Sequence, residues 1–251
     1  MATVAAVAVA LLAGCSNSEE AAAPTTSAPR PPAATSATEP AEPTGSSPTG
    51  EPGVCTYVPT PDEAPAKPVD PPTAATPPAA TGTVTLRTTN GDITLTMDAT
   101  GAPCTAQSIL HLARSKFYDD SPCHRLVMSE TFRILQCGDP TGSGSGGPGY
   151  TIPDEPPTDL EDAPAAGASI YPRGVVAMAK TTAPNSGGSQ FFLVFGDSYL
   201  PPDYTIFGTI DEAGLAVLDK IGAAGDDGSM DSGAGGGAPK LATTITEAVA
   251  G

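Results

Sequence analysis

Few side chains in this sequence could do chemistry. The chain has five cysteines but no Cys-x-x-Cys pair, and its only histidines are His111 and His124, so the spacing does not indicate a zinc site. A glycine-rich run at 142–149 lacks the Gly-Lys-Ser/Thr ending of a phosphate-binding loop and leads into no predicted helix. Ser186 and Ser189 lie outside any Gly-x-Ser-x-Gly motif, which argues against a serine hydrolase. We expect both histidines to be structural or surface residues.

Four of the cysteines could form disulfides. An even number in an exported chain permits two disulfides with three possible pairings. Cys123 and Cys137 flank a predicted strand-turn-strand and could be cross-strand neighbours, so we favour Cys123–Cys137 together with Cys55–Cys104. Four buried free thiols remain the alternative.

The fifth cysteine, Cys15, follows a short apolar run. Residues 2–13 are too few to span a bilayer and suit the hydrophobic region of a signal peptide. The run ends in Leu-Ala-Gly-Cys and then turns polar, which resembles a bacterial lipobox. The resemblance implies that residues 1–14 are a signal peptide and that acylated Cys15 anchors the protein to the outer face of the cell membrane. No Lys or Arg precedes the run, so an upstream start or an uncleaved anchor stays open.

Composition divides the rest of the chain. Residues 1–80 hold 16 of the 29 prolines but only one aromatic residue, Tyr57, so most of this stretch cannot bury enough apolar surface to fold. We expect a disordered tether at 15–53, a Pro-rich segment at 54–81 that docks on the domain through a disulfide, and one folded domain at 82–251. The net charge of −17 argues against nucleic acid and anionic membrane surfaces as partners.

The elements of the domain follow from hydrophobic periodicity. Residues 83–98 alternate around Asn90-Gly91, a strong hairpin signal, and Pro103 opens a helical pattern that reaches Phe117. A second short helix is predicted at 213–221. Further strands are predicted at 123–127, 132–136, 174–180, 189–196, 204–210 and 241–249. Many short strands with two helices favour an antiparallel β-barrel over alternating βαβ units.

Six motifs in this domain resemble those of one family, in matching order and spacing. They are Cys123-His124-Arg125-Leu126, Leu135-Gln136-Cys137-Gly138-Asp139, the glycine-rich loop 142–149, Ala177-Met178-Ala179, the run from Pro184 to Phe192 (PNSGGSQFF), and Tyr204-Thr205-Ile206-Phe207-Gly208. By these motifs, which span most of residues 83–249, the domain resembles the cyclophilins. The resemblance implies a closed eight-stranded antiparallel barrel capped by two helices, peptidyl-prolyl cis-trans isomerase activity, and no cofactor or metal.

The resemblance assigns Arg125 as the central catalytic residue. An X-Pro bond rotates slowly because amide resonance gives its C–N bond partial double-bond character. An enzyme need only bind the twisted amide better than the planar one. In the twisted state the prolyl nitrogen gains a localised lone pair, to which a fixed cationic donor such as arginine can hydrogen-bond. Gln136 is implied to help hold the substrate backbone and Arg125.

The resemblance also assigns substrate contacts. Phe192 is implied as the floor of an apolar proline pocket. Because Phe191 and Phe192 alternate, one should face the core. Gly144 and Gly146 would let their loop approach the substrate closely. The other implied contacts are Ile134, Ala179, Lys180, Gln190, Tyr199, Leu200 and Tyr204.

Three departures from the family pattern affect this assignment. The connection from Arg125 to Gln136 is about three residues longer than usual. The family's pocket phenylalanine therefore has no clear counterpart, and Phe132 could supply it. Tyr199 and Tyr204 stand where animal cyclophilins have Trp and His, which puts tight cyclosporin binding in doubt.

The predicted function is a monomeric foldase that acts on proline-containing segments of unfolded or exported proteins. The alternative is a module that binds Pro-containing peptides as a chaperone or scaffold with little catalysis, which the changed pocket around Phe132 motivates. A solute-binding lipoprotein is a third possibility, but it usually needs a larger, two-lobed domain.

Overall fold

The computed structural model describes residues 54–73 and 82–251, and both stretches belong to one compact unit. Cys15, the predicted signal peptide and the predicted tether at 15–53 lie outside the described residues. Within the described stretches, neither helix has the length and apolar character needed to cross a membrane.

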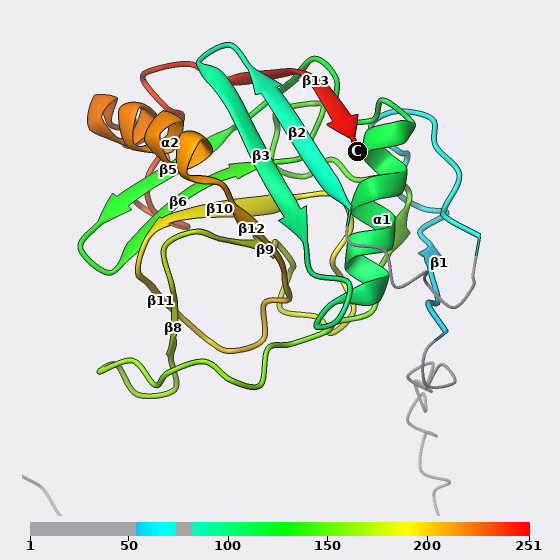
Figure 1. The fold of residues 1–251 in the computed structure, drawn as a ribbon, viewed down its shortest axis with the longest axis horizontal. Helices are drawn as coiled ribbons and strands as arrows, with labels where there is room; N and C mark the ends of the chain where they lie inside the picture. Colours follow the sequence, from blue (N-terminus) through cyan, green and yellow to red (C-terminus); the bar gives the residue numbers. More distant parts are fainter. Residues whose placement is uncertain (1–53, 74–81) are drawn as a thin grey trace, which may run out of the picture. The chain divides into compact units, whose positions relative to one another are not determined.

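Nine strands form the main sheet, in the order β4-β13-β2-β3-β12-β9-β10-β6-β5 (Figure 1). All neighbouring pairs are antiparallel. The strands are β2 (Thr83–Thr88), β3 (Gly91–Met97), β4 (Ser121–Pro122), β5 (Arg125–Ser129), β6 (Phe132–Cys137), β9 (Val175–Met178), β10 (Phe191–Gly196), β12 (Ile206–Ile210) and β13 (Thr244–Ala250).

This sheet differs from the predicted closed eight-stranded barrel. Within the described residues, no ladder joins its outer strands β4 and β5, so the sheet is curled but open. The two edge strands are only two residues apart in the chain, so the chain itself passes from one edge of the sheet to the other. Pro122, which has no N–H to donate, ends the two-residue strand β4. At the other edge, the backbone of Gly237 exchanges hydrogen bonds of 2.7 and 3.1 Å with Leu126 of β5, so a loop rather than a strand covers that edge.

Two helices and two small sheets complete the unit. Helix α1 (Pro103–Arg114) lies at the right of Figure 1 and helix α2 (Glu212–Ala224) at the upper left, and both pack against the same core cluster inside the curled sheet. Strand β1 (Val58–Pro59) pairs with β7 (Tyr150–Thr151), and β8 (Ser169–Tyr171) pairs with β11 (Ser198–Leu200). The predicted long strands and both predicted helices are present within a few residues of their expected bounds.

The first hairpin shows how local chemistry sets register. Thr88 pairs with Gly91, so the two-residue turn is Thr89-Asn90 and lies one residue earlier than the Asn90-Gly91 pair suggests. Gly91 has a φ of 135°, which a residue with a side chain rarely adopts. The Asn90 side chain also ties the turn to Thr243 and to the backbone of Ala242, next to the closing strand.

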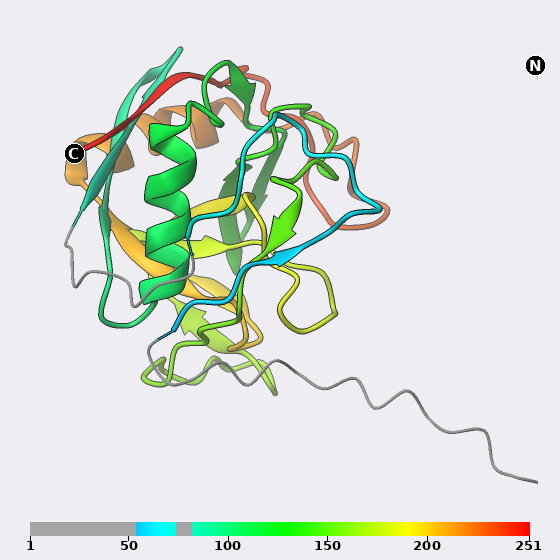
Figure 2. The ribbon, with the colours of Figure 1, turned by 90° about the vertical axis from the view of Figure 1, so that its right-hand side faces the viewer.

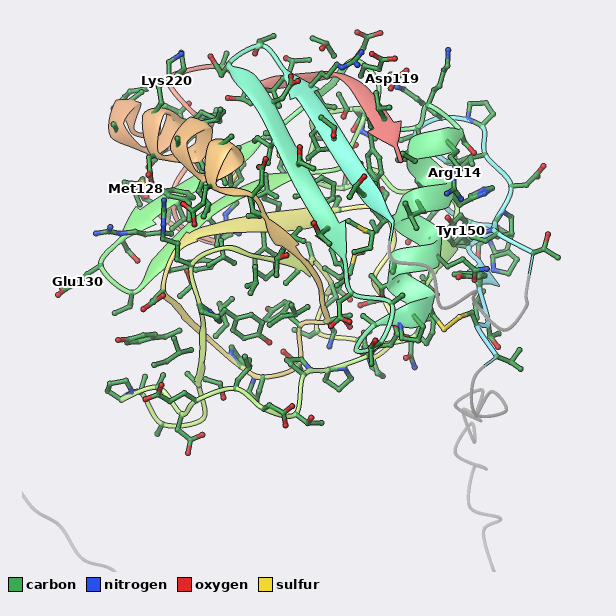
Figure 3. The ribbon with its side chains drawn as sticks, in the orientation of Figure 1. Arg114, Asp119, Met128, Glu130, Tyr150 and Lys220 are labelled. Carbon is green, nitrogen blue, oxygen red and sulfur yellow. A yellow bond between two sulfur atoms is a disulfide. The ribbon has the colours of Figure 1, made fainter. Side chains whose placement is uncertain are left out.

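Residues 54–73, which we call the strap, run beside α1 (Figure 2). The structure contains the disulfides Cys55–Cys104 and Cys123–Cys137, the pairing favoured from the sequence. Figure 3 shows a disulfide as a yellow bond between α1 and the strap. The Tyr57 hydroxyl donates to the Cys104 carbonyl at 3.0 Å, and its ring meets that of Tyr150 edge to face.

A carboxylate from the loop before β8 caps α1. Ala102, at the N-cap position, offers no side-chain acceptor, and the helix begins with Pro103. Glu155 supplies the cap, because its two carboxylate oxygens accept from the backbone N–H groups of Cys104 and Thr105 at 2.9 Å. A carboxylate at this end of a helix satisfies free N–H groups and opposes the helix dipole.

Buried apolar residues form two clusters. The larger lies inside the curled sheet and extends under both helices and the strap. The smaller lies on the other face of β6, β9 and β10 and includes Phe192, Ile134 and Tyr171. Adjacent residues of β10 divide between them, with Phe191 in the larger cluster and Phe192 in the smaller. The smaller cluster forms the apolar pocket of the candidate site described below.

Replacing both Cys55 and Cys104 by Ser should lower the free energy of unfolding by about 2–4 kcal/mol, because this disulfide closes a long loop with a sequence separation of 49 residues. Urea unfolding followed by circular dichroism measures the change. The matched control is Cys123 and Cys137 replaced together. That disulfide spans only 14 residues, so its chain-entropy contribution should be smaller. An unchanged unfolding midpoint in the Cys55/Cys104 variant would contradict the strap's structural role.

Candidate active site

Arg125, the first residue of β5, is held by three acceptors. Its Nη1 donates to Gln136 Oε1 at 3.1 Å, its Nε to the Gly235 carbonyl at 3.0 Å, and its Nη2 to the Ala234 carbonyl. The guanidinium carbon lies 5.5 Å from the centre of the Phe132 ring, within cation–π range. A guanidinium has five N–H donors, so two remain for a ligand.

Strand register places the glutamines. Arg125 is directly opposite Gln136 in the β5–β6 ladder, and Gln136 is opposite Phe192 in the β6–β10 ladder. Gln136 Nε2 donates to Gln190 Oε1 at 3.0 Å. Gln190 Nε2 then donates to the carbonyls of Gly144 and Gly146. These bonds form a relay that runs from the glycine-rich loop through two side chains to the guanidinium.

Asp139 organises the glycine-rich loop from within. Its side chain is fully buried and accepts backbone N–H bonds from Thr141, Gly144 and Gly146 at 2.8–3.0 Å. Burial raises the pKa of this carboxyl, but the hydrogen bonds from Thr141 and from the loop backbone outweigh burial and leave the pKa below its ordinary value. A Cβ at Gly146 would collide with the carboxylate, which explains the glycine there.

An apolar pocket lies beside Arg125. Phe192 meets Tyr204 edge to face with ring centres 5.6 Å apart. The Tyr171 hydroxyl holds the Tyr204 backbone by accepting from its N–H and donating to its carbonyl, both at 3.1 Å. Phe132, assigned from sequence as a substitute pocket residue, packs against this cluster and beneath Arg125. The other predicted contacts that pack there are Ile134, Ala179 and Leu200.

Two of the predicted substrate contacts, Tyr199 and Lys180, do not pack in the apolar cluster of the pocket. Tyr199 is half-buried on β11, where its N–H donates to the Thr131 carbonyl, and it is outside the set that packs in the apolar cluster. Lys180 Nζ is 3.4 Å from Asp154 and 3.2 Å from Asp203, and only 7% of its side chain is exposed. Burial lowers the pKa of Lys180, but these two carboxylates outweigh burial and raise it. Lys180 is therefore an ion-paired cation rather than a free one.

Arg125 is the cation that faces the pocket. Burial lowers the pKa of Arg125, while nearby Tyr204 raises it, and an arginine remains protonated at neutral pH. Burial also lowers the pKa of neighbouring His124; Asp139 opposes this change and Arg125 adds to it. His124 is therefore neutral at pH 7, and its buried Nδ1 has no partner among the described residues.

A groove of about 620 Å³ with both polar and apolar surface adjoins the pocket. Gln136, Gln190, Ala179 and Lys180 line it together with the glycine-rich loop, including Gly144. The Ala179 N–H already donates to the Gln190 carbonyl at 2.9 Å, which leaves the Ala179 carbonyl for a bound peptide. The arrangement therefore joins a fixed cation, an apolar pocket and a groove of mixed polarity.

Sequence reasoning missed two parts of the site. Ala234 and Gly235, which hold the guanidinium, lie in the loop between α2 and β13, where no sequence motif indicates a site. Thr60, Glu63 and Ala64 of the strap line the groove. The expected docking of the 54–81 segment pointed toward that second set, but nothing in its sequence showed which residues reach the site.

Among residues 54–73 and 82–251, no group of three or more His, Cys, Asp or Glu could hold a metal ion. The site presents donors and a shaped apolar surface, which suit the stabilisation of a ligand's geometry.

Comparisons with known proteins identify the family. Residues 83–248 match the family model described as cyclophilin type peptidyl-prolyl cis-trans isomerase/CLD. The chain therefore belongs to the cyclophilin family.

Two mycobacterial proteins are particularly similar to the chain. It is 45% identical over 196 residues to a probable peptidyl-prolyl cis-trans isomerase B of Mycobacterium leprae, and 44% identical over 197 residues to one of Mycobacterium tuberculosis. Each similarity covers 76% of this chain, which is more than residues 82–251 alone comprise, so it reaches the segment before residue 82. The chain spans 64% and 61% of these relatives' own lengths.

Solved structures of one relative support the fold. A cyclophilin type isomerase of Cryptosporidium parvum matches with a TM-score of 0.53 and 26% identity, over 68% of this chain and 98% of that one. A second crystal structure of that protein, in the presence of the dipeptide Ala-Pro, matches with a TM-score of 0.51 and 27% identity, over 66% and 97% of the two chains.

Asp139→Asn should destabilise the protein by about 2–4 kcal/mol at pH 7, because a buried charged acceptor of several hydrogen bonds is weakened. Since the folded-state pKa of Asp139 lies below its unfolded value, its stabilisation is complete above about pH 4 and is lost as the pH falls through the folded-state pKa. The difference between wild type and variant should therefore shrink on acidification. Urea unfolding at several pH values measures it, and a difference that grows toward low pH would contradict this account.

Proposed function

We propose that this protein is a peptidyl-prolyl cis-trans isomerase with Arg125 as its catalytic residue. The observation that carries the proposal is the guanidinium fixed by Gln136, Ala234 and Gly235 at the edge of the Phe192 pocket. In this proposal the pyrrolidine ring enters the pocket, and a free N–H of Arg125 meets the prolyl nitrogen.

The geometry favours rotation without a covalent step. A planar amide nitrogen is a poor acceptor because its lone pair is delocalised, whereas a twisted amide has a localised lone pair. A donor held in advance therefore stabilises the twisted state more than the planar one, which is the condition for a faster reaction. The relay through Gln136 and Gln190 fixes the donor before substrate arrives, so little reorganisation is needed.

The comparisons support this proposal. The mycobacterial relatives are named as isomerases, and the Cryptosporidium parvum relative was crystallised in the presence of a dipeptide that ends in proline. The peptide-binding module remains the alternative. Phe132 packs against the pocket and beneath Arg125, which weakens the changed-pocket argument that motivated it.

Arg125→Ala should lower kcat/KM for isomerisation of an Ala-Pro peptide by about 100- to 1,000-fold, the effect of removing one fixed donor from a reacting centre. Arg125→Lys should recover little of this loss, because a point charge cannot replace the fork that contacts three acceptors. The matched control is Arg133→Ala. That exposed arginine on β6 donates to the Ser129 carbonyl, away from the relay, and its loss should change kcat/KM by less than about twofold.

Two outcomes would overturn the assignment. Wild type that binds proline peptides without accelerating their isomerisation would favour the binding module. Equal losses in the Arg125 and Arg133 variants would remove the special role of Arg125.

We further propose that the protein is a lipoprotein at the outer face of the bacterial cell membrane, where it acts as a monomer on proline-containing segments of exported proteins. The apolar run at 2–13, the Leu-Ala-Gly-Cys sequence ending at Cys15 and the polar residues that follow support the anchor. The pairing of four cysteines in two disulfides agrees with an oxidising compartment.

Mass spectrometry of the membrane fraction of a bacterium that expresses the full chain should find acylation on Cys15. Cys15→Ala should move the protein out of that fraction, because the acyl chains supply its membrane affinity. Ser16→Ala, one residue along, is the control and should leave the protein in the membrane fraction. Wild type that is unmodified and fractionates away from the membrane would contradict the lipoprotein proposal.

A further inference from the structure

We propose that the strap is part of the substrate-binding site and that Glu63 makes the enzyme prefer prolines flanked by a basic residue. This inference rests on the isomerase function proposed above and deepens it by naming a substrate class. We infer it from the contacts of the strap with the glycine-rich loop and the groove, which do not include the apolar pocket.

The strap contributes residues to the groove. Thr60, Glu63 and Ala64 line it together with Gln190 and the glycine-rich loop. The groove has both polar and apolar surface and a volume of about 620 Å³, which is enough space for a long side chain. The family motifs begin after residue 82, so none of them contributes these strap residues.

The strap is held firmly on both sides of Glu63. The Thr60 N–H donates to the Gly149 carbonyl at 2.9 Å, and the Ala66 N–H donates to the Gly147 carbonyl at 2.8 Å. Between these points, the Glu63 N–H closes a turn on the Thr60 carbonyl at 3.0 Å. Farther back, β1 pairs with β7, and the Cys55–Cys104 disulfide fixes the start of the strap (Figure 3). Glu63 therefore occupies a defined place at the groove.

Glu63 gives the groove a negative charge that no neighbouring cation neutralises among the described residues. Glu63 and Lys180 are the two charged residues that line the groove. Lys180 is paired with Asp154 and Asp203, whereas Glu63 makes no ion pair or side-chain hydrogen bond among the described residues. Lys67, the strap cation four residues along, donates to the Asp119 carbonyl instead. A lysine or arginine in the groove would meet an available carboxylate, and an acidic side chain would be repelled.

The groove and the catalytic arginine share two residues. Gln136 and Gln190 line the groove and also form the relay to Arg125. The groove therefore lies next to the pocket, and in this proposal one extended peptide places its proline in the pocket and a neighbouring side chain in the groove. An extended peptide advances about 3.3 Å per residue, so the basic residue should lie within a few positions of the proline.

The test measures kcat/KM for peptides that carry Lys or Glu at each of the three positions on either side of one proline, with the full chain as enzyme. At one position, wild type should favour Lys over Glu by about two- to fivefold, the range for one partly solvated ion pair. Glu63→Gln should bring this ratio close to one, and Glu63→Lys should reverse it. The matched control is Asp62→Asn, which removes an equal exposed charge one residue away, outside the groove lining, and should keep the preference.

Salt gives a second readout. The Lys/Glu ratio of wild type should decline as ionic strength rises to about 0.5 M, because salt screens the interaction, whereas kcat/KM for the neutral parent peptide should stay nearly constant. If wild type turns over the neutral peptide but shows no Lys/Glu preference that depends on Glu63, the inference is wrong and the isomerase proposal stands. If it accelerates isomerisation of none of these peptides, the isomerase proposal itself fails.

Discussion

The site depends on one interaction, the hydrogen bond from Arg125 to Gln136 across the β5–β6 ladder. An arginine at the edge of a sheet would ordinarily sample many rotamers, and ordering it costs conformational entropy. Here the ladder places the two residues opposite each other, and the carbonyls of Ala234 and Gly235 accept two further hydrogen bonds from the guanidinium. Because folding has already ordered the guanidinium, it can face a reacting amide without further reorganisation.

A chain of hydrogen bonds and packed segments holds Gln136, and through it Arg125, in place. Gln136 is oriented by Gln190, Gln190 by the glycine-rich loop, and the loop by buried Asp139. The strap then holds the outer part of the loop at Gly147 and Gly149 and is itself tied to α1 by a disulfide. A segment that sequence composition presents as a linker is thus both a structural support and a wall of the groove.

The sequence predicted what short-range chemistry determines. Periodicity located the long strands and both helices, and the motifs around Arg125, Gln136 and Phe192 located the site. It could not show that the sheet stays open, because no pattern in the sequence indicates that the strand breaks after Pro122 or that the backbone of Gly237, rather than another strand, pairs with Leu126. Nor could it show that Ala234 and Gly235 hold Arg125, since backbone carbonyls act whatever their side chains are. Phe132 could be named from the sequence as a substitute pocket residue, but its position beneath Arg125 and beside the pocket comes from the structure.

The most direct test separates binding from rotation. Two-dimensional exchange NMR on one X-Pro peptide would follow cis–trans interconversion with wild type and with Arg125→Ala, each at a peptide concentration that saturates it. We expect fast exchange with wild type, and slow exchange with Arg125→Ala while the peptide still binds the Phe192 pocket. Equal acceleration by the two proteins would show that the fixed guanidinium is not what stabilises the twisted amide.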